Sequence, residues 1–295
     1  MGRTFANLPG YEILSRIGKG AGAVIYEARA TATRQTVTLK HVVRHGPDED
    51  RFVAQAENEH EVARGLDHPN LRRSLEIVRV RRWLKLAELF LILEHVPGET
   101  LENRRKAAPR PGEPLDELLD VFIQIAAGLQ ALHKQGFAHA DIKPNNVILT
   151  DGGVKLIDFG QSCPLGHRKE RVQGTPDYMA PEQVLRHPID QRTDVFNLGA
   201  TMYWVTTGKW FRTMMSSAPA GSKRIELESR VGNDPPHAVN PEIPLPLSQL
   251  IQDCCENEPR QRPRDMGAVV YRLELVKMHL RKRKSDAASG SERSA

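Results

Sequence analysis

The sequence has few of the residues on which small secreted proteins and single-strand nucleic-acid binders depend. It contains only three cysteines, two of them adjacent at Cys254 and Cys255, and this gives neither a disulfide framework nor a metal-ligand spacing. Aromatic residues make up 5% of the chain, too few to favour the stacking surfaces of a nucleic-acid partner. We therefore expect a reducing, cytoplasmic setting.

Long apolar runs are also absent. The longest, Leu89–Leu93, is far shorter than the ~20 residues that cross a bilayer, so we expect no membrane span. The first residues lack the apolar core of a signal peptide, and Asn7 stands where a myristoylation signal has serine or threonine. The net charge of +5 is small, and four of the positive charges lie in Arg281–Lys284, so charge alone identifies no partner.

What is present is typical of a folded globular protein, with 39% hydrophobic and 27% charged residues. After Pro9 the chain alternates and is rich in β-branched residues, and Phe52, Ala56, Ala63 and Leu66 then change to helical spacing. The pattern predicts one helix and strands over residues 11–17, 24–28, 35–43, 75–80 and 86–93.

A break at Val96–Glu99 is the predicted hinge, and the chain beyond it becomes mainly helical. The pattern predicts helices over 118–132, 194–206, 247–255 and 266–280, and a hairpin of 146–150 with 154–158. Residues 214–246 have the composition of a long loop with room for one short helix, and the chain from Ser285 has that of a disordered tail. His133 and His167 are expected at the surface.

A glycine cluster, Gly18–Gly22, lies between two predicted strands. A dinucleotide-binding motif would instead open a helix, so this context argues against that fold. Glycines in a turn between strands let backbone N–H groups approach phosphate oxygens, although a plain glycine-rich turn has the same sequence.

Lys40 and Glu59 form the next candidate pair. Glu59 lies in the apolar stripe of its predicted helix, where an unpaired carboxylate costs several kcal/mol. Lys40, on the preceding strand among Val37, Leu39 and Val42, is the expected partner. Taken alone, such a pair is more often a structural salt bridge than part of a catalytic site.

A denser cluster surrounds the predicted hairpin. Residues 139–146 precede it and Asp158 follows it, which brings two carboxylates and an amide to one edge. Asn146 and Asp158 offer the hard oxygen ligands that suit Mg²⁺, Asp141 is available to accept a hydroxyl proton, and Lys143 to offset phosphoryl charge. These are the parts that phosphoryl transfer requires.

Taken in order, these motifs resemble a eukaryotic-like (Hanks-type) serine/threonine protein kinase, with features of its bacterial branch, from about Tyr11 to about Leu280. The family's motifs stand here as Gly18-x-Gly20-x-x-Ala23, Val37-Thr38-Leu39-Lys40, Asp158-Phe159-Gly160 and Ala180-Pro181-Glu182. Lys143, two residues after Asp141, is the mark of the serine/threonine class. Asp194 resembles the aspartate that braces the catalytic loop, and Arg262 the arginine that pairs with Glu182.

The resemblance implies an α+β, two-lobed protein kinase fold, with a small antiparallel-sheet N-lobe carrying one helix and a larger, mainly helical C-lobe. It places an N-terminal extension at 1–10, the kinase domain at 11–280 (N-lobe about 11–95, hinge 94–98, C-lobe about 99–280) and a basic, serine-rich tail at 281–295. The implied activity is ATP-dependent phosphorylation of serine or threonine hydroxyls on protein substrates.

The resemblance also implies the site. The catalytic residues would be Asp141, Lys143, Lys40 and Glu59, and Mg²⁺ (or Mn²⁺) would be held by Asn146 and Asp158. Leu93 stands at the gatekeeper position, and Thr175 is expected to hydrogen-bond near Asp141 and Lys143. ATP would be bound by Ile17, Gly18, Lys19, Gly20, Ala21, Gly22, Ala23, Ile25, Thr38, Lys40, Leu93, Glu94, Val96 and Ile148.

Three positions depart from the family pattern. Ala23 replaces the third glycine, Thr38 replaces the alanine that contacts adenine, and Ala140 replaces the arginine that grips a phosphorylated activation segment. Between Ser162 and Thr175 there is also no hydroxyl to phosphorylate. The missing arginine at position 140 and the missing hydroxyl together predict a kinase that does not need phosphorylation of its activation segment.

Other functions remain open on the sequence. A pseudokinase scaffold or binding module would share the fold, but such proteins typically lose the counterparts of Lys40, Asp141 or Asp158. A small-molecule kinase would lack the segment Thr175–Glu182 that docks a peptide. The basic tail could contact nucleic acid, although a solvated tail has the same composition.

Overall fold

The computed structural model describes residues 8–20, 22–44, 46–83, 85–107, 115–215 and 233–292, with side chains as far as residue 282. The chain forms two compact units. The first runs to Gly98 and also includes Ile157–Ser162, and the second comprises Glu99–Leu156 and the chain from Cys163 onward. The boundary between Gly98 and Glu99 falls at the end of the predicted hinge, 94–98.

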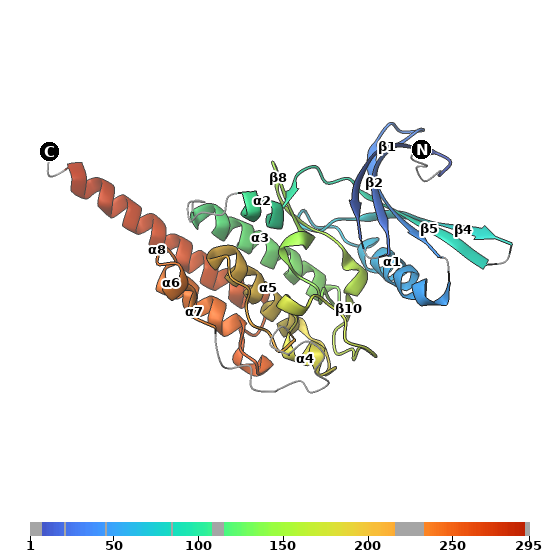
Figure 1. Cartoon of the computed structure of the whole chain (residues 1–295). Coiled ribbons are helices and arrows are strands. Elements are labelled where there is room, and N and C mark those ends of the chain that lie inside the picture. Colours follow the sequence, from blue (N-terminus) through green and yellow to red (C-terminus); the bar gives the residue numbers. More distant parts are fainter. Residues whose placement is uncertain are drawn as a thin grey trace. The chain divides into compact units, whose positions relative to one another are not determined.

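The first unit is an antiparallel five-stranded sheet with one long helix, α1 (Asp50–Ala63), against it (Figure 1). The strands follow the order β1-β2-β3-β5-β4. Their bounds are β1 Tyr11–Lys19, β2 Val24–Ala30, β3 Thr36–Val43, β4 Ser74–Arg82 and β5 Lys85–Glu94. A short 3-10 helix, Pro47–Glu49, precedes α1.

The apolar run in β5 explains how this sheet is filled on both faces. Leu89, Leu91 and Leu93 pack with residues of α1, whereas Phe90 and Ile92 pack in a second cluster. Successive side chains of a strand point to opposite faces, so an uninterrupted apolar run is the sequence of a strand that is buried on both sides. β5 is thereby the central packing element of the first unit.

The second unit is mainly helical. Its helices are α2 Leu101–Ala107, α3 Leu115–Lys134, α4 Pro181–Val184, α5 Gln191–Thr207, α6 Pro236–Val239, α7 Leu245–Cys254 and α8 Met266–Glu292. Two small antiparallel sheets complete it, β6-β8-β9 and β10-β7. Their strands are β6 Glu99–Thr100, β7 Phe137–Ala138, β8 Val147–Thr150, β9 Gly153–Leu156 and β10 Cys163–Pro164.

Helix α5 is the core of this unit, because every residue from Thr193 to Thr206 is buried. A helix that is buried on all sides has no polar stripe, which is why its sequence mixes threonine, glycine and apolar residues. Gly199 is where α5 meets the C-terminal end of α7. A Cβ built on it would lie 2.6 Å from Cys254 Cβ and 2.8 Å from Cys255 Sγ.

The last helix differs from the sequence prediction. We expected a helix over 266–280 and a disordered tail from Ser285, but α8 continues to Glu292. Propagating an existing helix avoids the unfavourable nucleation step, and the alanines, arginines and lysines here are good helix formers. Residues 293–295 lie outside the described residues. No helix in the part of the chain that the structure describes has the length and apolar character to cross a membrane.

Other boundaries moved by smaller amounts. Leu66 was expected on the first helix, but α1 ends at Ala63 and Leu66 is buried beyond it. The short elements α2, β6, β7 and β10 were not predicted, because two to seven residues are too few to show a period. Within the predicted loop 214–246, α6 and the start of α7 are helical, and residues 216–232 lie outside the described residues.

The contact at Gly199 generates a stability prediction. Gly199→Ala would force a methyl group into the backbone and side chains of the α7 terminus, so we expect a loss of about 1–3 kcal/mol in the free energy of unfolding. Gly65→Ala is the matched control, because a Cβ there meets nothing within 4 Å. Denaturant unfolding of both variants measures the difference, and equal stabilities would contradict the close packing of α5 on α7.

Candidate functional site

The predicted ion pair of Lys40 and Glu59 is present in the first unit, and a second carboxylate joins it. Lys40 Nζ on β3 donates to Glu59 Oε2 at 2.6 Å and to Asp158 Oδ1 at 3.0 Å. Burial alone would lower the pKa of Lys40, but the charges of Asp158 and Glu59 outweigh it and raise this pKa above its ordinary value. Lys40 is therefore held as a fixed cation.

Glu59 has a second cationic partner that the sequence did not reveal. Its side chain is fully buried, and Arg72, which follows α1, donates Nη2 to Glu59 Oε1 at 2.9 Å. Each carboxylate oxygen of Glu59 thus accepts from a different cation. This arrangement satisfies a group that would be costly to bury with a single partner.

The segment that carries Asp158 is fixed to α1 by another residue that was not predicted. Asn58 Nδ2 donates to the carbonyl oxygens of Phe159 and Gly160 at 3.2 Å and of Ser162 at 2.8 Å. Asp158 itself has a left-handed backbone with φ of 66°, which sets its carboxylate toward Lys40. Asparagine beside a predicted helix stripe has no distinctive spacing, so the sequence offered no signal for this role.

The glycine turn joins β1 to β2 and lies close to α1. Gly20 N–H donates to Ala23 O at 2.8 Å, and a Cβ on Gly22 would come within 2.0 Å of the Phe52 ring. Gly22 is therefore required by the approach of Phe52. Ala21, predicted to bind nucleotide, lies outside the described residues.

The other predicted nucleotide-binding residues of the first unit lie on β1, β2, β3 and β5 or just after β5. Thr38 Oγ1 lies 3.3 Å from His95 Nδ1, which gives a partner to the hydroxyl that replaces the family's alanine. Glu94 accepts from Arg73 N–H at 3.0 Å, and Leu93 is buried. Ile148 is on β8 in the second unit. The predicted nucleotide-binding residues on β1 and β2 are Ile17, Gly18, Lys19 and Ile25.

In the second unit the predicted catalytic residues Asp141 and Lys143 contact each other and Thr175. Thr175 Oγ1 donates to Asp141 Oδ1 at 2.9 Å, and Lys143 Nζ donates to Asp141 Oδ2 at 2.8 Å and to Thr175 Oγ1 at 2.7 Å. The predicted contact of Thr175 with this pair is therefore confirmed. Asn146 Nδ2 donates to Asp141 O at 2.8 Å, which fixes the amide beside the same loop.

The predicted brace of this loop, Asp194, is fully buried. Its carboxylate accepts from the backbone N–H of His139 at 2.8 Å and of Ala140 at 2.7 Å. Burial alone would raise the pKa of Asp194, but the hydrogen bond and charge of His133, the charge of His139 and the backbone N–H of Ala140 lower it below its ordinary value. His133 was expected at the surface. That expectation was wrong, because its ring lies 2.7 Å from Asp194 and is nearly buried.

The chain after Asp158 is held by backbone pairing. β10 pairs with β7, so that Cys163 lies opposite Ala138, and His167 forms a bridge with Ile189. Arg186 donates to Glu170 O at 2.9 Å. These contacts order residues 163–170 without any phosphorylated side chain.

Within residues 166–170 of this segment, Lys169 differs from its neighbours in being buried. Its neighbours Arg168 and Glu170 are exposed, but Lys169 is buried. Burial lowers the pKa of Lys169, an effect partly offset by Cys163, Asp141 and Asp194. The segment thus places a cation within electrostatic range of the carboxylates of Asp141 and Asp194.

The predicted pair of Arg262 and Glu182 is confirmed. The two guanidinium nitrogens of Arg262 donate to the two oxygens of Glu182 at 2.7 and 2.9 Å, and both residues are buried. Thr193 Oγ1 also donates to Glu182 at 2.8 Å. This bidentate contact fastens α4, and with it the segment that follows Thr175, to the chain before α8.

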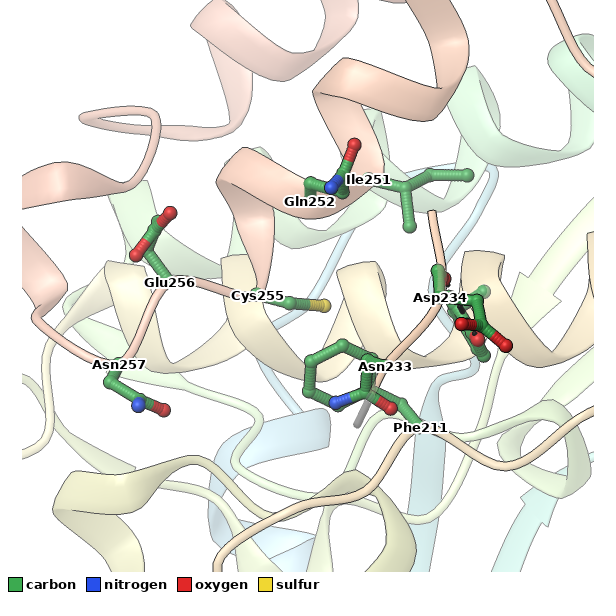
Figure 2. Close-up of a pocket in the computed structure, with 9 residues that line it drawn as sticks. Phe211, Asn233, Asp234, Ile251, Gln252, Cys255, Glu256 and Asn257 are labelled. Carbon is green, nitrogen blue, oxygen red and sulfur yellow. Dashed lines mark hydrogen bonds between the residues drawn. The ribbon is translucent and has the colours of Figure 1, made fainter. Parts of the chain in front are cut away.

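A separate pocket of about 180 Å³ lies in the second unit, between α5, the end of α7 and the loops beside them. Figure 2 shows the thiol of Cys255 directed into it, with Phe211 and Asn233 opposite. Burial raises the pKa of Cys255 well above its ordinary value, which disfavours the nucleophilic thiolate form. None of the predicted site residues lines this pocket, which sets it apart from the candidate site.

The chain belongs to the protein kinase family. The family described as protein kinase domain matches residues 11–271, which cover both units. The predicted fold class is therefore confirmed, with the five-stranded antiparallel sheet in the N-terminal part and the helices in the C-terminal part.

Its relatives among curated proteins include bacterial serine/threonine kinases. The chain is 28% identical to a probable serine/threonine-protein kinase of Clostridium acetobutylicum over 272 residues, 90% of this chain and 40% of that protein. It is 28% identical to one of Clostridium perfringens over 273 residues, with 90% and 38% coverage. It is 30% identical to the probable serine/threonine-protein kinase PkwA of Thermomonospora curvata over 262 residues, with 86% and 32% coverage. The chain thus spans less than half the length of each.

The burial of Glu59 generates a second stability prediction. Glu59→Gln keeps the shape but leaves Lys40 and Arg72 with a neutral partner, so we expect a loss of about 3 kcal/mol in the free energy of unfolding. Glu57→Gln on the same helix is the matched control. Its pair with Arg79 is exposed, so the expected change is within about 0.5 kcal/mol. Denaturant unfolding distinguishes the two, and a small loss for both would show that Glu59 is not needed.

Proposed function

We propose that this chain transfers phosphate from ATP to serine or threonine hydroxyls of protein substrates. The observation that carries the proposal is the contact of Asp141, Lys143 and Thr175 on one loop system. A carboxylate with one fixed cation beside it is suited to receive the hydroxyl proton while the cation stabilises phosphoryl charge. The family and its serine/threonine relatives support the same reaction.

Asp141 would orient the acceptor hydroxyl and take its proton. In the structure its Oδ1 accepts the hydroxyl of Thr175, so this oxygen already binds the kind of donor that a substrate serine would supply. Lys143 holds the other oxygen and would offset the charge on the transferred group. Asp194, through the amides of His139 and Ala140, would keep the loop in position.

The predicted site residues of the first unit suit a nucleoside triphosphate. Lys40, a fixed cation between Glu59 and Asp158, would contact its phosphates, and the backbone of Gly18 and Gly20 would approach them. The adenine would lie near Thr38 and the chain at Leu93–Val96. ATP, when bound, supplies the phosphoryl group.

Asn146 and Asp158 would hold Mg²⁺, or Mn²⁺ in its place. Asn146 uses its NH₂ group on Asp141 O, which leaves its hard carbonyl oxygen for a metal, and Asp158 supplies a carboxylate. Within the described residues no group of three or more His, Cys, Asp and Glu side chains could hold a metal ion by itself. That fits an ion that keeps waters and phosphate oxygens in its shell, and when bound it neutralises phosphate charge.

The three cysteines are buried free thiols, and the setting proposed from the cysteine content of the sequence is a reducing, cytoplasmic one. The substrates would then be proteins of that compartment that bear serine or threonine acceptors.

Two isosteric variants test the reaction. We expect Asp141→Asn and Asp158→Asn each to lower the rate of phosphate transfer from Mg-ATP to a generic basic protein by more than about 100-fold, because one loses the proton acceptor and the other a metal ligand. Asparagine tolerates the left-handed backbone of Asp158, so the fold should persist. Exposed Asp151→Asn is the control and should be unchanged.

If the wild-type chain transfers phosphate and both variants keep a rate within about tenfold of it, the assigned roles would be contradicted. No transfer by the wild-type chain, with ATP binding intact, would instead support a pseudokinase scaffold. Thermal unfolding of each variant checks that the fold is kept.

A separate prediction concerns control. The paired backbone of residues 163–170 and the burial of Lys169 order the segment without phosphate, so we expect activity to be independent of its phosphorylation. Purified protein treated with a phosphatase and shown by mass spectrometry to carry no phosphate on Ser162 or Thr175 should keep its rate. A drop of more than about tenfold that reverses as phosphate returns would contradict this.

A further inference from the structure

The tip of the β4–β5 hairpin carries the most exposed large apolar side chain described in the structure. Arg82 pairs with Lys85 across the end of the hairpin, and Trp83 lies at the turn with 99% of its surface exposed. Figure 1 shows the hairpin extending past the other strands of the first unit. Nothing in the described fold packs on this ring.

The turn itself gives no reason for a tryptophan. Trp83 has φ of 58°, a left-handed conformation that glycine or asparagine adopts readily and that is disfavoured for a bulky residue. The side chain is therefore unfavourable for the turn and adds nothing to the core. A single exposed apolar side chain is common on protein surfaces, so the feature that distinguishes this tip is the ring together with the charges beside it.

The charged side chains of residues 77–87, which form the end of the hairpin, are all basic. Residues 77–87 include Arg79, Arg81, Arg82 and Lys85 and contain no aspartate or glutamate. Arg79 is paired with Glu57 and Arg82 with Glu88. Arg81 and Lys85 are exposed, and they keep the tip positively charged.

These features favour one kind of partner. A tryptophan ring prefers the boundary between water and hydrocarbon, and lysine and arginine beside it are attracted to anionic headgroups. A protruding turn can enter a flat lipid surface, whereas single-stranded nucleic acid needs a groove with several aromatic side chains. Only one aromatic side chain is present at this tip.

We propose that the β4–β5 tip, formed by Arg81, Arg82, Trp83 and Lys85, is a peripheral docking point for an anionic lipid bilayer. One ring and a few cations give weak, reversible binding that salt weakens further. The tip would therefore orient the protein on a membrane or add to another attachment. The proposal does not depend on the proposed kinase activity, because its readout is binding.

Vesicle binding of the full chain tests it. We expect co-sedimentation with vesicles of phosphatidylcholine containing about 30% phosphatidylserine, and little with phosphatidylcholine alone or in ~0.5 M NaCl. Trp83→Asn removes the ring and suits the left-handed turn, so it should fold normally and lower the partition coefficient by at least about tenfold. The double variant Arg81→Glu with Lys85→Glu should do the same.

Two controls make the result specific. Leu245→Asn removes an exposed apolar side chain elsewhere, and Arg168→Glu reverses an exposed charge, so both should bind within about twofold of wild type. Because the cations at Arg281–Lys284 also attract anionic lipid, the diagnostic quantity is the part of binding that depends on Trp83. A blue shift of tryptophan emission on vesicles, lost in Trp83→Phe, should accompany it.

Equal vesicle binding by wild type and Trp83→Asn, or no emission shift, would overturn the proposal. So would wild-type binding that is the same on anionic and neutral vesicles. If Trp83→Asn instead abolished binding to a single-stranded oligonucleotide and left vesicle binding unchanged, the tip would be a nucleic-acid contact and the lipid proposal would be wrong.

Discussion

The cost of burying a carboxylate organises both units of this protein. Glu59 has no exposed surface, and it is stable there because Lys40 and Arg72 each donate to one of its oxygens. Those two bonds connect α1 to β3 and to the chain after α1. Lys40 in turn donates to Asp158. One buried charge therefore fixes the helix, a strand and the aspartate that the proposed chemistry needs.

The same constraint recurs in the second unit with different donors. Asp194 is satisfied by two backbone amides and by His133, and Glu182 by both arms of Arg262 and by Thr193. Each of these carboxylates is buried far from its partner in sequence. Removing any one partner would leave a charge in the interior, so these contacts restrict the loops to a single arrangement.

The sequence predicted those parts of this network that can be recognised from the spacing of apolar residues along the chain. Glu59 was found because it lies within an apolar stripe, and β3 because its residues are β-branched and alternate between apolar and polar. Arg72, Asn58 and His133 were not found, since each acts through a contact with a residue distant in sequence or on another element. Nothing local distinguishes a histidine that will meet a buried aspartate from one that faces water.

Boundaries were predicted less well than elements, for a related reason. The end of α8 depends on the balance between propagating a helix and solvating a charged tail, which composition does not decide. Lys169 shows the same limit in the activation segment. Its sequence, Arg168-Lys169-Glu170, is that of an exposed loop, and only the fold shows that the middle residue is buried.

The contact between Thr38 and His95 has a consequence for small molecules directed to the proposed nucleotide site. The direction of the 3.3 Å hydrogen bond depends on which nitrogen of the imidazole carries the proton. If Nδ1 is unprotonated, Thr38 donates to it and offers a compound only lone pairs; if Nδ1 carries the proton, the threonine hydroxyl is free to donate. A compound that carries a hydrogen-bond acceptor opposite this hydroxyl would select the tautomer with a proton on Nδ1. A chain with alanine in place of Thr38 has no hydroxyl to donate to such a compound. Selectivity could therefore be built on the tautomer of one histidine.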